Sequence, residues 1–174
     1  MRIGTLAHTL AKAYLNPASR RRTIFLKGPS GIGKTEVVFQ MANILKAHIP
    51  NWDGVRDIRL SQFAPEDFRG VPYVAEGRTF WAVPSFWPKP GTAGIIFLDE
   101  ITKRTSKIME AATSGMLLEH RFGEWIAPEG SIVYGAANNA SDGVGDTMLA
   151  HNGNRSMILN LLKANNRSGA TWAL

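Results

Sequence analysis

One eight-residue stretch constrains this chain more than any other. Residues 28–35 read Gly-Pro-Ser-Gly-Ile-Gly-Lys-Thr, which fits the Walker A pattern of Gly, four spacers, Gly, Lys and then Ser or Thr. A short β-branched and aromatic run at 23–27 precedes it, and a helical pattern begins just after Lys34. This strand–loop–helix order predicts a phosphate-binding loop rather than a Gly-rich turn that matches by accident.

The residue types in this loop suit the binding of phosphate. Gly28, Gly31 and Gly33 can adopt backbone angles closed to other residues, so successive N–H groups can point at one anion. The following helix adds the positive end of its dipole. Lys34 can reach the β- and γ-phosphates, and the Thr35 hydroxyl can ligate magnesium. We therefore expect the nucleotide to be held by Gly28, Pro29, Ser30, Gly31, Ile32, Gly33, Lys34, Thr35 and Glu36.

Length and composition predict one globular domain. The chain has 174 residues, of which 44% are hydrophobic and 20% are charged. It contains no cysteine and no apolar run of the roughly 18 residues that a membrane span needs, so we expect a cytoplasmic protein. The net charge of +6 and the adjacent arginines at 20–22 leave nucleic-acid binding or a targeting segment open, although a solvated turn is the simpler interpretation.

Predicted strands alternate with predicted helices along the chain. Helical spacing covers residues 3–14, 34–47 and 105–118, and strand patterns cover 23–27, 55–61, 94–98, 131–136 and 156–162. The run at 94–98 is continuously apolar, as expected of a central parallel strand covered on both faces. This alternation predicts an α/β fold with a parallel sheet.

The stretch from residue 62 to 94 is less regular, because five prolines argue against long helices or strands. Residues 71–75 and 78–83, joined by Glu76-Gly77, predict a short hairpin. Residues 122–130 predict a loop or a second small hairpin. Five aromatic rings gather here, and we interpret them as capping the core rather than forming a partner-binding surface: Tyr73, Phe80, Trp81, Phe86 and Trp87.

Two carboxylates follow the apolar run at 95–98. The carboxyl ends of parallel strands share one edge, and the phosphate loop leaves its own strand at that edge. Asp99 is therefore expected to hold magnesium through water, and Glu100 to orient or deprotonate a water that attacks the γ-phosphate. The alternative is that Asp-Glu only caps the next helix. Because a small-molecule kinase does not need this glutamate, the pair favours hydrolysis.

At this point the chain resembles the AAA+ ATPase superfamily, and within it the MoxR-like branch, over roughly residues 3–162. The resemblance rests on five motifs in order: Gly-Pro-Ser-Gly-Ile-Gly-Lys-Thr (28–35), Pro-Glu-Asp-Phe-Arg-Gly (65–70), Ile-Ile-Phe-Leu-Asp-Glu-Ile (95–101), Ala-Ala-Asn-Asn-Ala-Ser-Asp-Gly (136–143) and Leu-Ala-His-Asn-Gly-Asn-Arg (149–155). It implies a three-layer αβα P-loop NTPase fold with a five-stranded parallel sheet of order 5-1-4-3-2. It also implies a ring, usually a hexamer, with ATP and Mg²⁺ bound between neighbouring subunits.

The resemblance also implies roles for residues that lie outside the two main motifs. Asn139, with Asn138 as the fallback, matches the sensor asparagine that contacts the γ-phosphate or the attacking water. Arg155 matches an arginine that reaches the neighbouring subunit's site. Gln62, at the end of the second strand, is a candidate for restraining the catalytic glutamate. Ala140 and Ser156 depart from the family pattern, which has a proline and an aromatic residue at those places.

The sequence ends just after the fifth predicted strand, so we expect residues 1–174 to form the nucleotide-binding core, truncated before the helical lid. The leading function is a magnesium-dependent ATPase that remodels a protein partner, in the manner of MoxR-like chaperones. One alternative is a module or truncated fragment that binds nucleotide without hydrolysing it. Another is a nucleic-acid-associated AAA+ motor. Client, ring size and the preference for ATP over GTP stay open.

Overall fold

The computed structural model describes residues 3–17, 22–101, 107–138 and 156–162. The helices in these ranges are α1 (Ile3–Leu15), α3 (Lys34–Lys46), α4 (Pro65–Arg69) and α5 (Lys107–Glu119), with one 3-10 turn, η1 (Leu60–Gln62). The strands are β1 (Thr23–Lys27), β2 (Trp52–Arg59), β3 (Val71–Ala75), β4 (Arg78–Ala82), β5 (Ala93–Asp99), β6 (Arg121–Phe122), β7 (Trp125–Ile126), β8 (Ile132–Ala137) and β9 (Ser156–Asn160). No helix in the described part of the chain combines the length and apolarity that crossing a bilayer requires.

The main sheet has five strands in the order β2-β5-β8-β1-β9, and each neighbouring pair is parallel. Counted among themselves in chain order, these strands lie as 5-1-4-3-2 when the sheet is followed from the β9 edge. The expected α/β fold with a five-stranded parallel sheet is thus confirmed. Because every strand runs in the same direction, β1, β5 and β8 present their carboxyl ends at one edge of the sheet.

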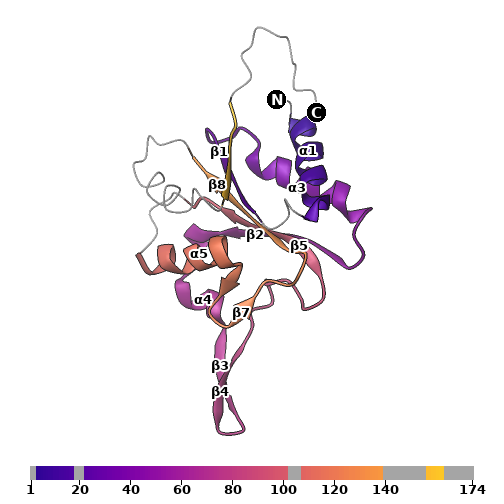
Figure 1. The fold of residues 1–174 in the computed structure, drawn as a ribbon. Helices are drawn as coiled ribbons and strands as arrows, with labels where there is room; N and C mark the ends of the chain where they lie inside the picture. The colour runs from indigo at the N-terminus through magenta and orange to yellow at the C-terminus, as the bar shows by residue number, and fades with distance from the viewer. Residues whose placement is uncertain (1–2, 18–21, 102–106, 139–155, 163–174) are drawn as a thin grey trace.

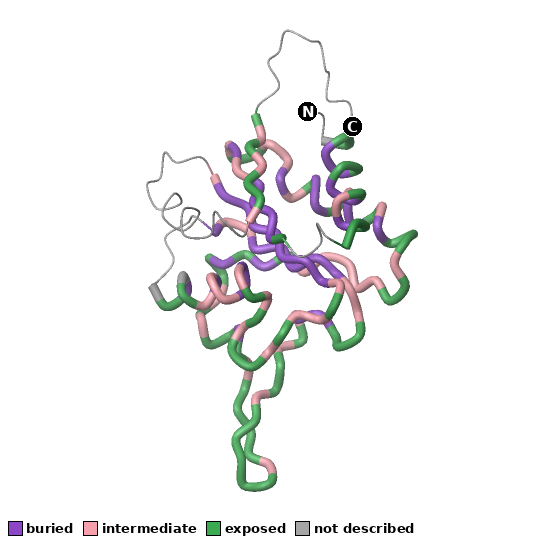
Figure 2. The backbone as a smooth tube through the Cα atoms, in the orientation of Figure 1, coloured by how far each residue is buried: buried purple, intermediate pink, exposed green. Residues whose placement is uncertain are grey.

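Helices cover both faces of this sheet (Figure 1). Alternate residues of β5 contribute to two different hydrophobic clusters, with Ile95 and Phe97 in one and Ile96 and Leu98 in the other. The first cluster includes buried residues of α1 and α3, and the second includes buried residues of α4 and α5. The central strands are accordingly the most continuously buried part of the chain (Figure 2).

Two elements between β1 and β5 differ from the prediction. Strand β2 starts at Trp52 rather than at residue 55, because Trp52 already pairs with Ala93 before an irregularity in the register. It ends at Arg59, and the next three residues form η1. The short helix α4 was not expected, because the local prolines argued against regular structure. Pro65 nevertheless occupies the start of α4, where its fixed φ suits the first helical turn.

The hairpin of β3 and β4 projects away from the body of the domain (Figures 1 and 2). Tyr73 and Phe80 stack on each other along it, with 50% and 37% of their surfaces exposed. Phe86 and Trp87 instead pack against Phe68 in the second hydrophobic cluster. The interpretation of the aromatic rings as core is therefore right for residues 86–87 and wrong for the hairpin. The small antiparallel pair β6–β7 confirms the second predicted hairpin.

Candidate nucleotide site

The phosphate loop connects β1 to α3 at the carboxyl edge of the sheet. Gly31 and Gly33 have φ angles of 74° and 91°, in the left-handed region that favours glycine. Gly28 has no positive φ, so the expectation of an unusual backbone angle is wrong there. Glycine is needed at this position for space instead, because a Cβ would lie 2.8 Å from the carbonyl oxygen of Leu161. The first helical hydrogen bond runs from Val37 N–H to Gly33 O, at 3.0 Å.

Lys34 is buried at the start of α3, and its ammonium group bonds to three oxygen atoms. Its Nζ donates to Gly28 O at 2.9 Å, to Pro29 O at 3.0 Å and to the Asn138 side-chain Oδ1 at 3.0 Å. Burial lowers the pKa of Lys34, and the neighbouring Asp99 carboxylate acts in the opposite direction. Asn138 follows the end of β8, so this contact links the phosphate loop to the strand beside β1.

The loop and the acidic end of β5 meet at the same edge. The Thr35 hydroxyl donates to Asp99 Oδ2 at 3.4 Å, across 64 residues of sequence. The other carboxylate oxygen, Oδ1, accepts the backbone N–H of Glu100 at 2.8 Å. The two sequence motifs therefore occupy one place in the fold. Glu36 lies one position further along α3 on an exposed surface, where its carboxylate accepts a hydrogen bond from Gln40.

Glu100 is held in an uncommon backbone conformation directly after β5. Its φ is 60°, in the left-handed region that residues other than glycine seldom adopt. Its carboxylate oxygen Oε2 accepts a hydrogen bond of 2.9 Å from the Ser61 hydroxyl. This contact comes from Ser61, the residue before the predicted candidate Gln62. Strand β2 ends at Arg59, two residues before Ser61, and the turn η1 that follows brings the Ser61 hydroxyl to Glu100.

Sequence analysis missed Asp57, which lies on β2 opposite Phe97 of β5. Arg59, two residues further along β2, pairs in register with Asp99. Burial raises the pKa of Asp57, the negative charge of Asp99 raises it further, and Arg59 lowers it. Three carboxylates therefore lie near the edge that receives the loop: Asp57 on β2, Asp99 at the end of β5, and Glu100 directly after it.

The donor groups at this edge fit magnesium. Mg²⁺ prefers hard oxygen ligands and usually keeps several waters while bound through one or two carboxylates and substrate phosphates. Thr35 and Asp99 provide a hydroxyl and a carboxylate that already lie within 3.4 Å of each other. Within the described ranges no group of three His, Cys, Asp or Glu side chains is placed to hold a metal alone. Such a site suits an ion that arrives with phosphate oxygens.

Two predicted site residues, Asn139 and Arg155, lie outside the described residues. Asn138, the fallback for the sensor position, is described and contacts Lys34. The remaining residues of the loop line the turn itself, with Ser30 and Gly31 exposed and Pro29 and Ile32 half-buried.

No curated protein matches this chain. The family described as AAA domain (dynein-related subfamily) matches residues 23–140, which include β1, the phosphate loop, the acidic end of β5 and β8. This match covers more than half of the 174 residues. The chain belongs to the AAA domain family, in its dynein-related subfamily.

Proposed function

We propose that this protein binds ATP with magnesium at the carboxyl edge of its sheet and hydrolyses it. The observation that carries the proposal is the 3.4 Å contact between Thr35 of the phosphate loop and Asp99 of β5. It brings together a lysine, a hydroxyl and two carboxylates, which are the groups that phosphoryl transfer to water requires. Family membership supports the nucleotide, since the family is one of AAA domains.

Each residue has a separate task in this proposal. The N–H groups of the loop and of the first turn of α3 precede the helical hydrogen-bond ladder and bind phosphate oxygens. Lys34 leaves at least one of its three oxygen partners and turns to the β- and γ-phosphates. Glu100 orients and deprotonates the attacking water while Ser61 holds its carboxylate. Magnesium held by Thr35 and Asp99 would neutralise charge on the phosphates.

The roles of two further residues belong to the same proposal. Asn139 senses the γ-phosphate next to Asn138. In this proposal Arg155 acts at the site of a neighbouring subunit in a ring. A guanidinium suits that role because it stays charged and can neutralise negative charge on the transferring phosphoryl group. The same proposal includes assembly into a ring, with the hexamer as the expected form.

We further propose that ATP turnover remodels a protein partner, in the manner of a MoxR-like chaperone. The projecting β3–β4 hairpin supports this role. Val71 and Val74 expose 70% and 76% of their surfaces, and Tyr73 and Phe80 are exposed beside them. An isolated two-stranded hairpin is marginally stable in water, and apolar side chains at its surface favour contact with another protein.

Two substitutions at the site test the ATPase proposal. Lys34→Ala should abolish ATP binding, because it removes the only cation that contacts the loop carbonyls among the described residues. Glu100→Gln should bind ATP normally and lower turnover by at least about a hundredfold, because it removes the general base while it keeps the shape of the side chain. Binding is measured with a fluorescent ATP analogue, and turnover by steady-state phosphate release. Equal turnover in the wild type and in Glu100→Gln would defeat the catalytic assignment.

A further inference from the structure

A cleft lies at the end of the sheet opposite the phosphate loop. Its volume is about 830 Å³, within the usual range of roughly 300–1,000 Å³ for ligand sites. Its wall includes Ala93, the first residue of β5, and Gly130, which lies two residues before β8 begins. The same two strands end at Asp99 and Ala137 beside the nucleotide site. The cleft is therefore distinct from the proposed ATP site and cannot be part of it.

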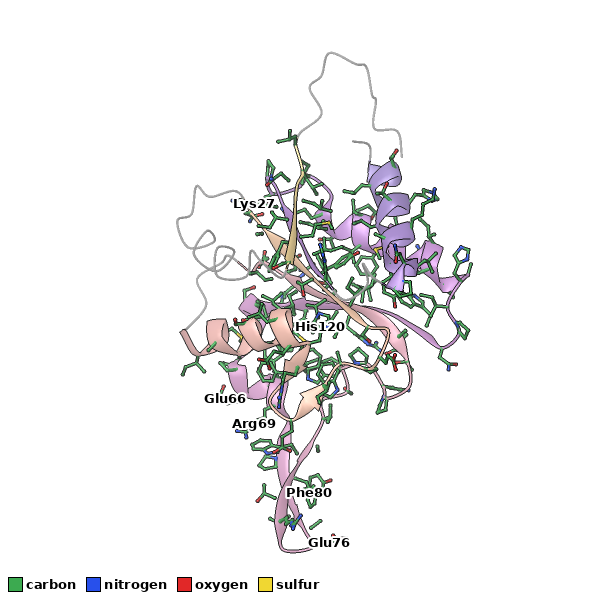
Figure 3. The ribbon with its side chains drawn as sticks, in the orientation of Figure 1. Lys27, Glu66, Arg69, Glu76, Phe80 and His120 are labelled. Atoms are coloured by element: carbon green, nitrogen blue, oxygen red, sulfur yellow. The ribbon has the colours of Figure 1, made fainter. Side chains whose placement is uncertain are left out.

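Three aromatic rings, Trp81, Phe122 and Trp125, line the cleft at the root of the projecting hairpin. Trp81 of β4 carries the Arg69 guanidinium over its ring, with Cζ 4.0 Å from the centroid. Figure 3 shows Arg69 at this root, below Glu66 of α4 and far from Glu76 at the hairpin tip. Trp125 is stacked on Trp87 of the core at 4.5 Å between centroids. The rings are thus fixed by packing before any partner arrives, which lowers the entropy cost of binding.

The rest of the wall offers little backbone hydrogen bonding. Pro88, Pro90 and Pro128 all line the cleft, and proline has no N–H group to donate. These three residues therefore cannot donate a backbone hydrogen bond to a partner. We expect a partner to bind here mainly by packing its apolar side chains against the rings of the cleft. Ile126, with 65% of its surface exposed, adds apolar area to the same wall. Aromatic grooves of this kind recognise extended polyproline-II segments, which are already ordered when free.

The charges at the cleft favour a basic partner. Glu124 and Glu129 line it with exposed carboxylates, whereas the one basic residue in the wall, Arg69, is engaged over Trp81. Arg69 keeps its charge there, so two carboxylates against one guanidinium give the lining a small net negative charge, whereas the whole chain has a net charge of +6. Carboxylates attract lysine or arginine in a partner and repel the phosphates of a nucleic acid. The negative charge of the two carboxylates therefore disfavours single-stranded DNA or RNA as the occupant of the cleft.

We propose that this cleft docks an extended, proline-containing segment of a partner protein in which lysine or arginine flanks the apolar residues. The rings of Trp81, Phe122 and Trp125 contact the apolar residues and prolines, and Glu124 and Glu129 pair with the basic ones. The proposal adds a docking site to the proposed partner role, but binding here needs no ATP turnover. The two proposals can therefore fail separately.

The test measures binding of a fluorescein-labelled peptide composed of Pro, Leu and Lys to the full 174-residue chain without nucleotide, by fluorescence anisotropy. The wild type and Lys34→Ala should bind the peptide equally. Reversal of both charges in Glu124→Lys/Glu129→Lys should weaken binding roughly fivefold, because two exposed ion pairs are lost. Ile126→Ser should weaken it by a similar factor, because apolar area is no longer buried.

Matched variants separate the cleft from the rest of the surface. Ile108→Ser removes an isoleucine that is 68% exposed on α5, against 65% for Ile126, and should leave affinity within about twofold. Glu76→Lys reverses one such charge at the hairpin tip and should also have little effect. A peptide with Glu in place of Lys should bind at least about fivefold more weakly. Absence of wild-type binding, equal losses in the matched variants, or preferential binding of oligo(dT) would each overturn the proposal.

Discussion

Gly135, in the middle of β8, leaves no room for even one methyl group. A Cβ at this position would lie 2.6 Å from Ile101 Cδ1 and 2.8 Å and 2.9 Å from ring atoms of Phe25. Phe25 and Ile101 are 1% and 3% exposed, so neither has free space to enter. Overpacking a tight core costs typically about 1–3 kcal/mol. We expect Gly135→Ala to reduce the free energy of unfolding by about 2 kcal/mol, near the middle of that range.

Gly135→Ala should also displace Glu100, the proposed general base. Ile101 follows Glu100 directly, and its N–H donates to Ala136 O at 3.1 Å, next to Gly135 in β8. When the added methyl group displaces Ile101, the strained Glu100 backbone moves with it. ATP turnover should therefore fall in Gly135→Ala even at temperatures where the protein stays folded. Nucleotide binding depends on the loop that follows β1 rather than on Glu100, so it should change less.

Urea denaturation followed by circular dichroism measures the first effect. A loss of about 2 kcal/mol corresponds to a melting temperature lowered by roughly 4–8 °C in a chain of this size. Gly4→Ala is the matched control, because it makes the same change in α1 at a place with no atom within 4 Å. It should raise stability by up to about 1 kcal/mol through helix propensity. Equal stability of Gly135→Ala and the wild type would refute the packing argument.

Two further predictions concern His120, which directly precedes the β6–β7 hairpin, and Gly70, at the root of the β3–β4 hairpin. Burial lowers the pKa of His120, whose Nε2 lies 3.3 Å from Thr23 Oγ1. The imidazole therefore binds a proton more readily in the unfolded chain, so the free energy of unfolding decreases as pH falls below the ordinary His pKa of 6.5. Asparagine tolerates the φ of 54° at this position, so His120→Asn should keep the fold while it reduces the change of the urea midpoint with pH in this range. If the urea midpoint of the variant changes with pH as steeply as that of the wild type, His120 is not the cause of the pH dependence. At the hairpin root, Gly70 has a φ of 88°, and a Cβ there would overlap the carbonyl oxygen of Ala82. Gly70→Ala should loosen the hairpin and speed tryptic cleavage after Arg78, and cleavage at the wild-type rate would show that the root tolerates the change.

Much of the fold could be predicted because its strongest signals are local. The apolar run at 95–98 indicates a strand buried on both faces, and β5 has that environment in the structure. The glycine pattern of residues 28–35 marks the strand-to-helix turn, and α3 begins at Lys34 as expected. The meeting of Thr35 and Asp99 then follows from parallel topology, which places the ends of β1 and β5 at one edge.

The parts that escaped prediction depend on contacts between distant residues. Trp52 belongs to β2 only because Ala93 lies opposite it, and sequence patterns within 49–54 read as a turn. Ser61 rather than Gln62 reaches Glu100 because β2 ends at Arg59 and the next residues turn into η1. From the sequence alone, the Ser61 hydroxyl and the Gln62 amide are equally suitable hydrogen-bond donors to the Glu100 carboxylate. The local bend after the strand decides between them.

The aromatic residues between 68 and 87 show the same limit most clearly. Their types are alike, yet Phe68 is 2% exposed and Trp87 is 3% exposed, whereas Tyr73 is 50% exposed. Composition cannot separate them, because the difference lies in where the chain turns away from the sheet at Gly70. Phe68 precedes that turn and packs in the second hydrophobic cluster, β3 and β4 leave the body after it, and the chain returns to the cluster at Phe86 and Trp87. Gly70, with its unusual backbone angle, therefore marks the point where the chain leaves the core for an exposed hairpin.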